Sequence, residues 1–201
     1  MTLYKQRERF GKLSVKIGLA FSKLPLSANQ WTVLSLVPAF IALYYLTQEQ
    51  FLLAGAFFIV SAFIDLIDGS VARVTSTVSR FGAYLDTIVD RYVEVIIVFG
   101  LLFVQLPEVF VPAYAWIFLY LFGSMMTTYV KAAAKEKELV PEGQELKGGL
   151  LERAERLLIL FVGILLAALN PLYLIYVVAG LAVLTNLSAI QRILIAKGLA
   201  T

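Results

Sequence analysis

The amino-acid sequence predicts an all-α integral membrane protein with six transmembrane helices, preceded by an N-terminal amphipathic helix at the membrane surface. Of its 201 residues, 60% are hydrophobic, and the mean hydropathy is +0.84, higher than in ordinary soluble domains. The hydrophobic residues form six stretches of about 20 residues, the length that crosses a bilayer as a helix. Lysine and arginine gather at alternate ends of these stretches, as in multi-pass membrane proteins.

Residues 1–24 have the pattern of an interfacial helix. Their charges run throughout the segment, which does not resemble a cleavable signal peptide. We expect this helix to lie on anionic headgroups, although packing on a protein partner is an alternative. The basic stripe comprises Lys5, Arg9, Lys12, Lys16 and Lys23, and the apolar stripe Phe10, Leu13, Ile17, Phe21 and Leu24.

One membrane domain is expected over residues 25–201. Polar segments and an Asn-Pro pair at 170–171 separate the predicted spans, and the sequence has no evident internal repeat. The six spans are predicted at 28–47, 50–72, 82–105, 110–134, 150–168 and 172–195.

The distribution of charge predicts the topology. All 17 lysines and arginines lie at ends that a six-span arrangement places on one side, whereas the opposite connections carry Glu49 and Glu108. The positive-inside rule therefore predicts a multi-pass protein of the cell (cytoplasmic) membrane with both termini in the cytoplasm. The same rule explains the pI of about 9.1 without a nucleic-acid partner.

Four aspartates stand at the predicted cytoplasmic ends of the second and third spans. Asp65 and Asp68 are three residues apart, and Asp86 and Asp90 are four apart, so each pair shares a helix face. Two antiparallel helices joined by a short loop would bring the four carboxylates together. Glu94 continues the second row one turn further into the membrane, and the sequence suggests no decisive role for it.

Four carboxylates at membrane depth repel one another and are poorly solvated. Divalent cations would relieve both effects, and oxygen ligands favour Mg²⁺, Mn²⁺ or Ca²⁺ over zinc. Two such ions can share four aspartates and also bind a pyrophosphate, to which Arg73 offers a further contact. Intramembrane ion pairs and a proton relay are the alternatives. Because the chain lacks histidine and cysteine, a general base must be a carboxylate, a lysine or a tyrosine.

The complete motif in residues 65–90 resembles the CDP-alcohol phosphotransferase family. It reads D-x2-D-G-x2-A-R-x8-G-x3-D-x3-D and matches the family pattern at all eight fixed positions. Six spans and the chain length are also similar to that family. The matching residues are Asp65, Asp68, Gly69, Ala72, Arg73, Gly82, Asp86 and Asp90.

This resemblance implies an enzyme that displaces CMP from a CDP-linked lipid with the hydroxyl of a second alcohol, with Mg²⁺ or Mn²⁺ as cofactor. It also implies a cytoplasmic active site and, by analogy with known members, a homodimer. Asp65, Asp68 and Asp86 would ligate metal, and Asp90 would be a ligand or the catalytic base. The CDP site would include Asp65, Asp68, Gly69, Ala72, Arg73 and Gly82.

Asn29 and Thr32 extend the resemblance to the first span. Family members often have an asparagine followed three residues later by a threonine, although Ala28 replaces the proline that commonly precedes the asparagine. An asparagine amide can bind a nucleotide. Alternatively, Ser27 or Asn29 simply caps the helix.

Basic residues on three predicted spans indicate an acceptor alcohol that carries its own phosphate. The segment "GLLERAERLLIL" and the terminal "QR" are similar to the inositol-phosphate branch of the family, so we expect inositol 1-phosphate. Glycerol 3-phosphate is the close alternative, and a positive-inside belt explains some of these cations without any acceptor. Glu152 and Glu155 can pair locally with the arginines. The predicted acceptor-phosphate ligands are Lys131, Lys135, Arg153, Arg156 and Arg192.

Two other functions are compatible with aspartates in a membrane protein. A polyprenyl transferase also uses aspartates and Mg²⁺, but it usually has two separated aspartate-rich motifs. A small cation or proton transporter usually has carboxylates in the middle of its spans and often a repeated half. The single constellation near the cytoplasmic ends favours the transferase.

Overall fold

The computed structural model describes residues 14–141, 146 and 148–199. Nearly all the regular structure in these residues is helical. The chain divides into two compact units, one built from residues 1–45 and 53–97 and the other from 46–52 and 98–201.

The first unit contains most of three long helices and the short helix that precedes them. They are α2 (Ala28–Leu34), α3 (Leu36–Thr47), α4 (Phe51–Val74) and α5 (Arg80–Gly100). Ala39 of α3 packs against a stripe on α5, which joins these helices through an apolar core. That stripe is spaced at three and four residues, as expected for one helix face, and comprises Val89, Val93 and Ile96.

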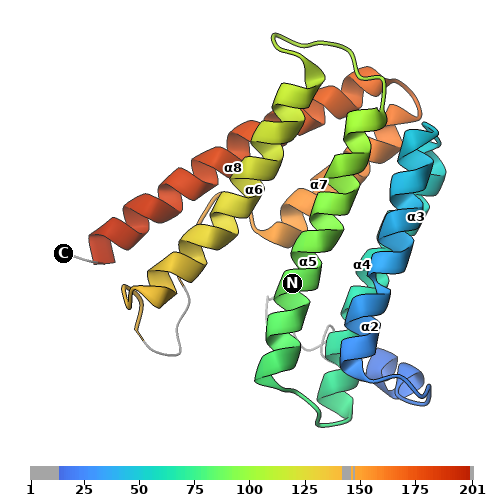
Figure 1. The fold of residues 1–201 in the computed structure, drawn as a ribbon, viewed down its shortest axis with the longest axis vertical. Helices are drawn as coiled ribbons and strands as arrows, with labels where there is room; N and C mark the ends of the chain where they lie inside the picture. The colour runs from blue at the N-terminus through green and yellow to red at the C-terminus, as the bar shows by residue number, and fades with distance from the viewer. Residues whose placement is uncertain (1–13, 142–145, 147, 200–201) are drawn as a thin grey trace, which may run out of the picture. The chain divides into compact units, whose positions relative to one another are not determined.

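A proline interrupts the first predicted span. Pro38 lacks an N–H, and its ring crowds the carbonyl four residues earlier, which belongs to Leu34 at the end of α2. Ser35 separates the two helices, and its carbonyl accepts a hydrogen bond from Ser61 Oγ at 2.8 Å. The chain nevertheless continues from α2 directly into α3 (Figure 1).

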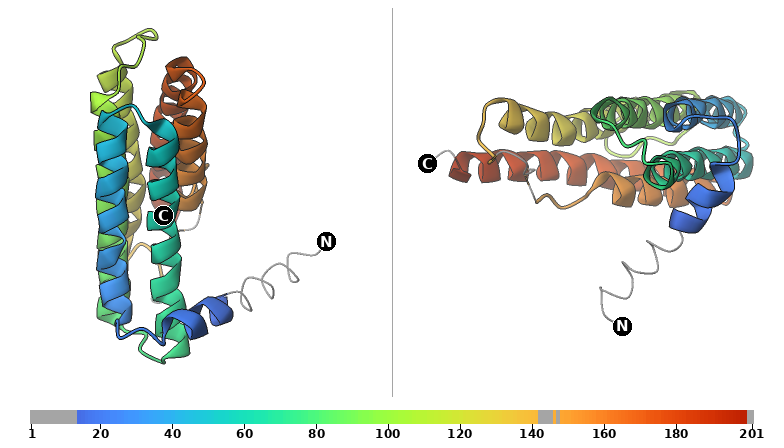
Figure 2. Two further views of the ribbon diagram at one scale, coloured as in Figure 1. Left: turned by 90° about the vertical axis from the view of Figure 1, so that its right-hand side faces the viewer. Right: turned by 90° about the horizontal axis from the view of Figure 1, so that it is seen from below.

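Residues 14–21 are helical and turn away from the direction of α4 (Figure 2). Ile17 and Phe21 pack against a core that contains Ile67 and Val71 of α4. Of the interfacial helix predicted over residues 1–24, the described residues 14–21 are helical and residues 22–24 are not. Residues 1–13, including Lys5, Arg9, Phe10, Lys12 and Leu13, lie outside the described residues.

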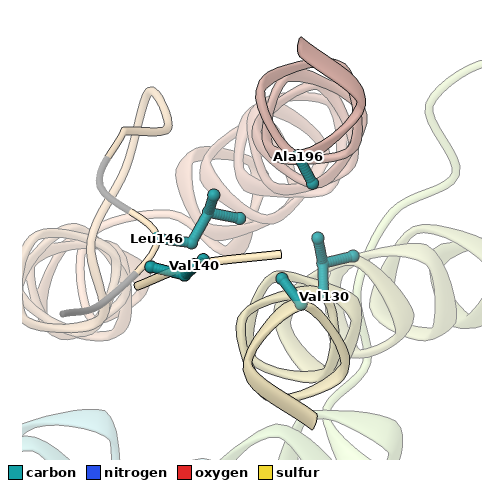
Figure 3. Close-up of a cluster of buried hydrophobic side chains, with 5 residues drawn as sticks. Val130, Val140, Leu146 and Ala196 are labelled. Atoms are coloured by element: carbon teal, nitrogen blue, oxygen red, sulfur yellow. The ribbon is translucent and has the colours of Figure 1, made fainter. Parts of the chain in front are cut away.

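The second unit contains η1 (Leu101–Phe103), α6 (Ala113–Glu136), α7 (Arg153–Ala167) and α8 (Pro171–Leu199). Helix α8 packs along both α6 and α7, and Figure 1 shows α6 and α8 side by side. Between α6 and α7, the buried side chains of Val140 and Leu146 pack in one cluster with Val130 of α6 and Ala196 of α8 (Figure 3).

Four helical stretches in the described part of the chain are long and apolar enough to cross a membrane. They are Ala28–Thr47, Phe51–Val74, Ala113–Glu136 and Pro171–Leu199. Helix α7 has 15 residues, and α5 carries several charged side chains, so the six-span arrangement remains a prediction. The third span was predicted over 82–105, but the helix α5 ends at Gly100 and a short 3-10 turn follows. Glycine is a poor helix former, which explains the end of α5 at this position.

Candidate functional site: a carboxylate cluster and a nucleotide-sized cavity

Three of the four predicted aspartates come together in the first unit. Asp65 and Asp68 of α4 and Asp86 of α5 have carboxylate oxygens that all lie within 4.8 Å of one another. The three-residue spacing places Asp65 and Asp68 on one face of α4. Asp90 lies outside this set in the described structure, so its place among the metal ligands remains a prediction.

Asp68 has the environment of a metal ligand. It is 5% exposed, and its Oδ2 atom has no hydrogen-bond partner among the described residues. A buried carboxylate oxygen without a partner is costly, and two neighbouring carboxylates increase that cost by repulsion. A divalent cation would satisfy all three carboxylates, and an all-oxygen donor set suits Mg²⁺, Mn²⁺ or Ca²⁺.

A cavity of about 360 Å³ opens beside this cluster. Of the predicted CDP-site residues, Asp65 is the one absent from its lining. The cavity is lined by the start of α2 and by motif residues of α4 and α5. The predicted residues in its lining are Asn29, Thr32, Asp68, Gly69, Ala72, Arg73, Gly82 and Asp86.

The local structure explains why Asn29 faces this cavity. Ser27 caps α2, because its Oγ accepts from Gln30 N at 3.3 Å while Gln30 Oε1 accepts from Ser27 N at 2.8 Å. The capping alternative therefore belongs to Ser27, and Asn29 is not needed as a cap. A Cβ atom on Gly82 would lie 3.2 Å from Asn29 Oδ1, so glycine keeps the two helices close here.

Arg73 is held over the motif glycine by residues that the sequence analysis did not identify. Its Nη2 atom donates to Ser14 Oγ at 2.8 Å, and a Cβ on Gly69 would lie 3.3 Å from its Nη1. A Cβ on Gly18 would lie 2.5 Å from the Ser70 carbonyl oxygen. Small residues thus let the helical residues 14–21 approach α4 beside Arg73. The four-residue spacing of Ser14 and Gly18 was the sequence signal that could have predicted this small-residue helix face.

Glu94, for which the sequence suggested no decisive role, is fully buried. Its Oε2 atom accepts a hydrogen bond from Arg91 Nη1 at 3.1 Å, across one turn of α5. This ion pair satisfies a charge that would otherwise be costly inside the helix packing.

In the second unit, Glu152 is the centre of an ion-pair network. Glu152 Oε1 lies 3.0 Å from Arg192 Nη2, and Oε2 lies 3.2 Å from Lys131 Nζ. The sequence had suggested pairing between Glu152 and the nearby arginines of α7, whereas Lys131 belongs to α6 and Arg192 to α8. Of the other predicted acceptor ligands, Lys135 is exposed, Arg153 is partly buried and Arg156 is buried.

Three further hydrogen bonds hold the buried arginines in place. Arg156 Nη1 donates to Thr127 Oγ1 at 3.3 Å. Arg192 Nη1 donates to the Thr127 carbonyl, and its Nε donates to the Gly148 carbonyl, both at 2.8 Å. Gly148 and Gly149 have φ values of +113° and +119°, which side-chain-bearing residues rarely adopt. A Cβ on Gly149 would lie 2.6 Å from Arg192 Nε.

The family model for CDP-alcohol phosphatidyltransferases matches residues 26–195. Archaetidylinositol phosphate synthase of Pyrococcus horikoshii is 34% identical over 196 residues, which cover 97% of this chain and 96% of that protein. Phosphatidylinositol phosphate synthase of Corynebacterium glutamicum is 31% identical over 183 residues, with 87% and 79% covered.

A solved structure has the same fold. The crystal structure of Mycobacterium tuberculosis phosphatidylinositol phosphate synthase with CDP-DAG bound matches with a TM-score of 0.80 and 24% identity. The match covers 92% of this chain and 94% of that one.

Proposed function

Because this chain belongs to the CDP-alcohol phosphatidyltransferase family, we propose that it transfers the phosphatidyl-type group of a CDP-linked lipid to inositol 1-phosphate and releases CMP. The observation that carries this proposal is the three-carboxylate cluster beside a cavity lined by the motif residues. The names of the two relatives that are 34% and 31% identical support inositol phosphate as the acceptor.

Asp65, Asp68 and Asp86 would hold divalent metal, with Mg²⁺ or Mn²⁺ as the candidates and two ions as the expected number. Bound metal would neutralise the diphosphate and stabilise CMP as it leaves. The fit is supported by the buried Asp68 Oδ2 atom and by the all-oxygen donor set.

The CDP group would occupy the cavity between α2, α4 and α5. Gly69 and Gly82 line this cavity without side chains, so phosphate and ribose could lie next to the backbone there. Arg73 would contact a phosphate oxygen, and Asn29 and Thr32 supply polar groups near the start of α2. The lipid tails would remain in the bilayer while the head group binds among the aspartates.

The transfer would exchange one phosphorus–oxygen bond for another. The acceptor hydroxyl oxygen attacks the β-phosphorus, the bond from that phosphorus to CMP breaks, and CMP leaves with the bridging oxygen. Asp90 would take the hydroxyl proton, because the chain has no histidine and a positioned carboxylate is a suitable base.

The acceptor's own phosphate would bind basic residues of the second unit. Arginine binds phosphate through two parallel N–H donors, which favours it over lysine in partly buried sites. The proposed ligands are Lys131, Lys135, Arg153, Arg156 and Arg192.

We propose that this multi-pass membrane protein has six spans, with α5 and α7 completing the four helical stretches that meet the length and hydropathy criteria. Residues 1–24 would form the interfacial helix and residues 25–201 the membrane domain. Both termini and the active site would face the cytoplasm of the cell membrane, and two chains would form a homodimer.

The experiment is CMP release by purified protein in lipid, with CDP-diacylglycerol or CDP-archaeol as donor and Mg²⁺ or Mn²⁺ present. Parallel reactions contain inositol 1-phosphate, glycerol 3-phosphate, free inositol or serine. CMP and a new lipid with inositol 1-phosphate are expected. Turnover with glycerol 3-phosphate instead would reassign the acceptor, and folded, metal-loaded protein that releases no CMP would contradict the proposal.

A further inference from the structure

Glu152 binds the two cations of the second unit in the way a phosphate group would. One carboxylate oxygen lies 3.0 Å from Arg192 Nη2 and the other lies 3.2 Å from Lys131 Nζ. Two oxygens of one anion therefore bridge side chains from two helices, α6 and α8. A phosphate offers the same pair of oxygens and carries more negative charge.

Burial distinguishes the members of this network. The Arg192 side chain is 2% exposed, that of Lys131 27% and that of Glu152 54%. Glu152 is thus the partner that solvent reaches most easily, and it covers a guanidinium that is otherwise buried. Because Glu152 Oε1 lies 3.0 Å from Arg192 Nη2, an anion that bound Nη2 at this position would have to replace the carboxylate.

Arg192 has two hydrogen-bond partners besides Glu152. Arg192 Nε and Nη1 each donate to a backbone carbonyl at 2.8 Å, one on Gly148 and the other on Thr127. Backbone carbonyls fixed in this way hold two edges of the guanidinium, while Nη2 points to a side chain. The Glu152 carboxylate, which also belongs to the capping box at the start of α7, is therefore the partner of Arg192 that another anion could replace.

We propose that Glu152 is a placeholder for the acceptor's phosphate: its carboxylate occupies the anion position between Lys131 and Arg192 until the phosphate displaces it. This inference rests on the proposed function, in which these cations bind the acceptor. Glu152 would thereby keep the buried charge paired when the site is empty. It would also weaken adventitious binding of other small anions, because each must compete with the tethered carboxylate.

The test compares Glu152→Gln with wild-type protein, using inorganic phosphate as the probe. Glutamine keeps the size and hydrogen-bonding reach of glutamate but removes the competing charge. Phosphate affinity, measured by calorimetry on the full chain in lipid, is expected to increase about three- to tenfold. The KM for inositol 1-phosphate is expected to fall by a similar factor while the KM for the CDP-lipid stays unchanged.

Glu136→Gln is the matched control, because Glu136 forms an exposed ion pair with Lys137 at 3.0 Å and the charge change is the same. This control should leave phosphate affinity unaltered. If Glu152→Gln destabilises the protein, the rise in melting temperature caused by phosphate still reports affinity, and it should be larger in the variant.

Unchanged or weaker phosphate binding in Glu152→Gln would overturn the inference, since Glu152 would then be only a structural partner of the cations. Direct phosphate binding does not require turnover. Failure of the proposed function, seen as absent CMP release by wild-type protein, is therefore distinguishable from failure of the placeholder.

Discussion

Gly149 is the position where a single methyl group should do most damage to the arginine network. Gly149 has φ +119°, and a Cβ there would lie 2.6 Å from Arg192 Nε and 2.7 Å from Ser188 Oγ. In Gly149→Ala, backbone strain costs about 1–3 kcal/mol. Displacing Arg192 also breaks its 2.8 Å bond to the Gly148 carbonyl, a bond to a charged donor worth about 1.5–3 kcal/mol.

Together these two terms predict that the free energy of unfolding falls by roughly 2.5–6 kcal/mol if the loop does not relax. Thermal unfolding in lipid and the KM for inositol 1-phosphate are the measurements, and both should change while the KM for the CDP-lipid does not. Gly180→Ala is the control, because a Cβ there meets no atom within 4 Å in the described structure. If Gly149→Ala matched wild type in melting temperature and acceptor KM, the reasoning about Arg192 would be refuted.

Two further predictions concern the donor and acceptor sites. Gly18→Ala should push the helical residues 14–21 away from α4, because its Cβ would lie 2.5 Å from the Ser70 carbonyl oxygen. Arg73 would then lose its hydrogen bond to Ser14. We expect a several-fold higher KM for the CDP-lipid and an unchanged KM for the acceptor. An unaltered donor KM would show that Ser14 does not position Arg73. Arg153→Gln should raise the KM for inositol 1-phosphate roughly ten- to hundredfold and leave the donor KM unchanged. Steady-state kinetics with each substrate varied in turn measure both values. An unchanged acceptor KM would show that Arg153 serves only the positive-inside charge distribution.

The spacing of the aspartates was informative because it depends only on helix geometry. Residues three apart share a face, and Asp65 and Asp68 do converge with Asp86. Spacing within a helix does not specify the register between α4 and α5. Asp90 is not one of the three clustered aspartates of the described residues, and its role stays a prediction. In the first span, Pro38 is a sequence signal for a helix break, but the break at Ser35 was not predicted.

Partners distant in sequence were the main omission. Glu152 lies 21 residues from Lys131 and 40 from Arg192, so no local pattern connects them. The Gly148–Gly149 pair was visible in the sequence as a backbone signal. Its close approach to Arg192, however, depends on the packing of α8 in the second unit.

The aspartate cluster is expected to hold the divalent ion on which CMP release depends. The most direct test is Mn²⁺ binding to purified protein in lipid, followed by electron paramagnetic resonance, for wild type and Asp68→Asn. Asparagine keeps the shape of the buried side chain but removes the charge, so the variant is expected to fold and to lose both Mn²⁺ binding and CMP release. Mn²⁺ binding by Asp68→Asn with wild-type affinity would contradict the account.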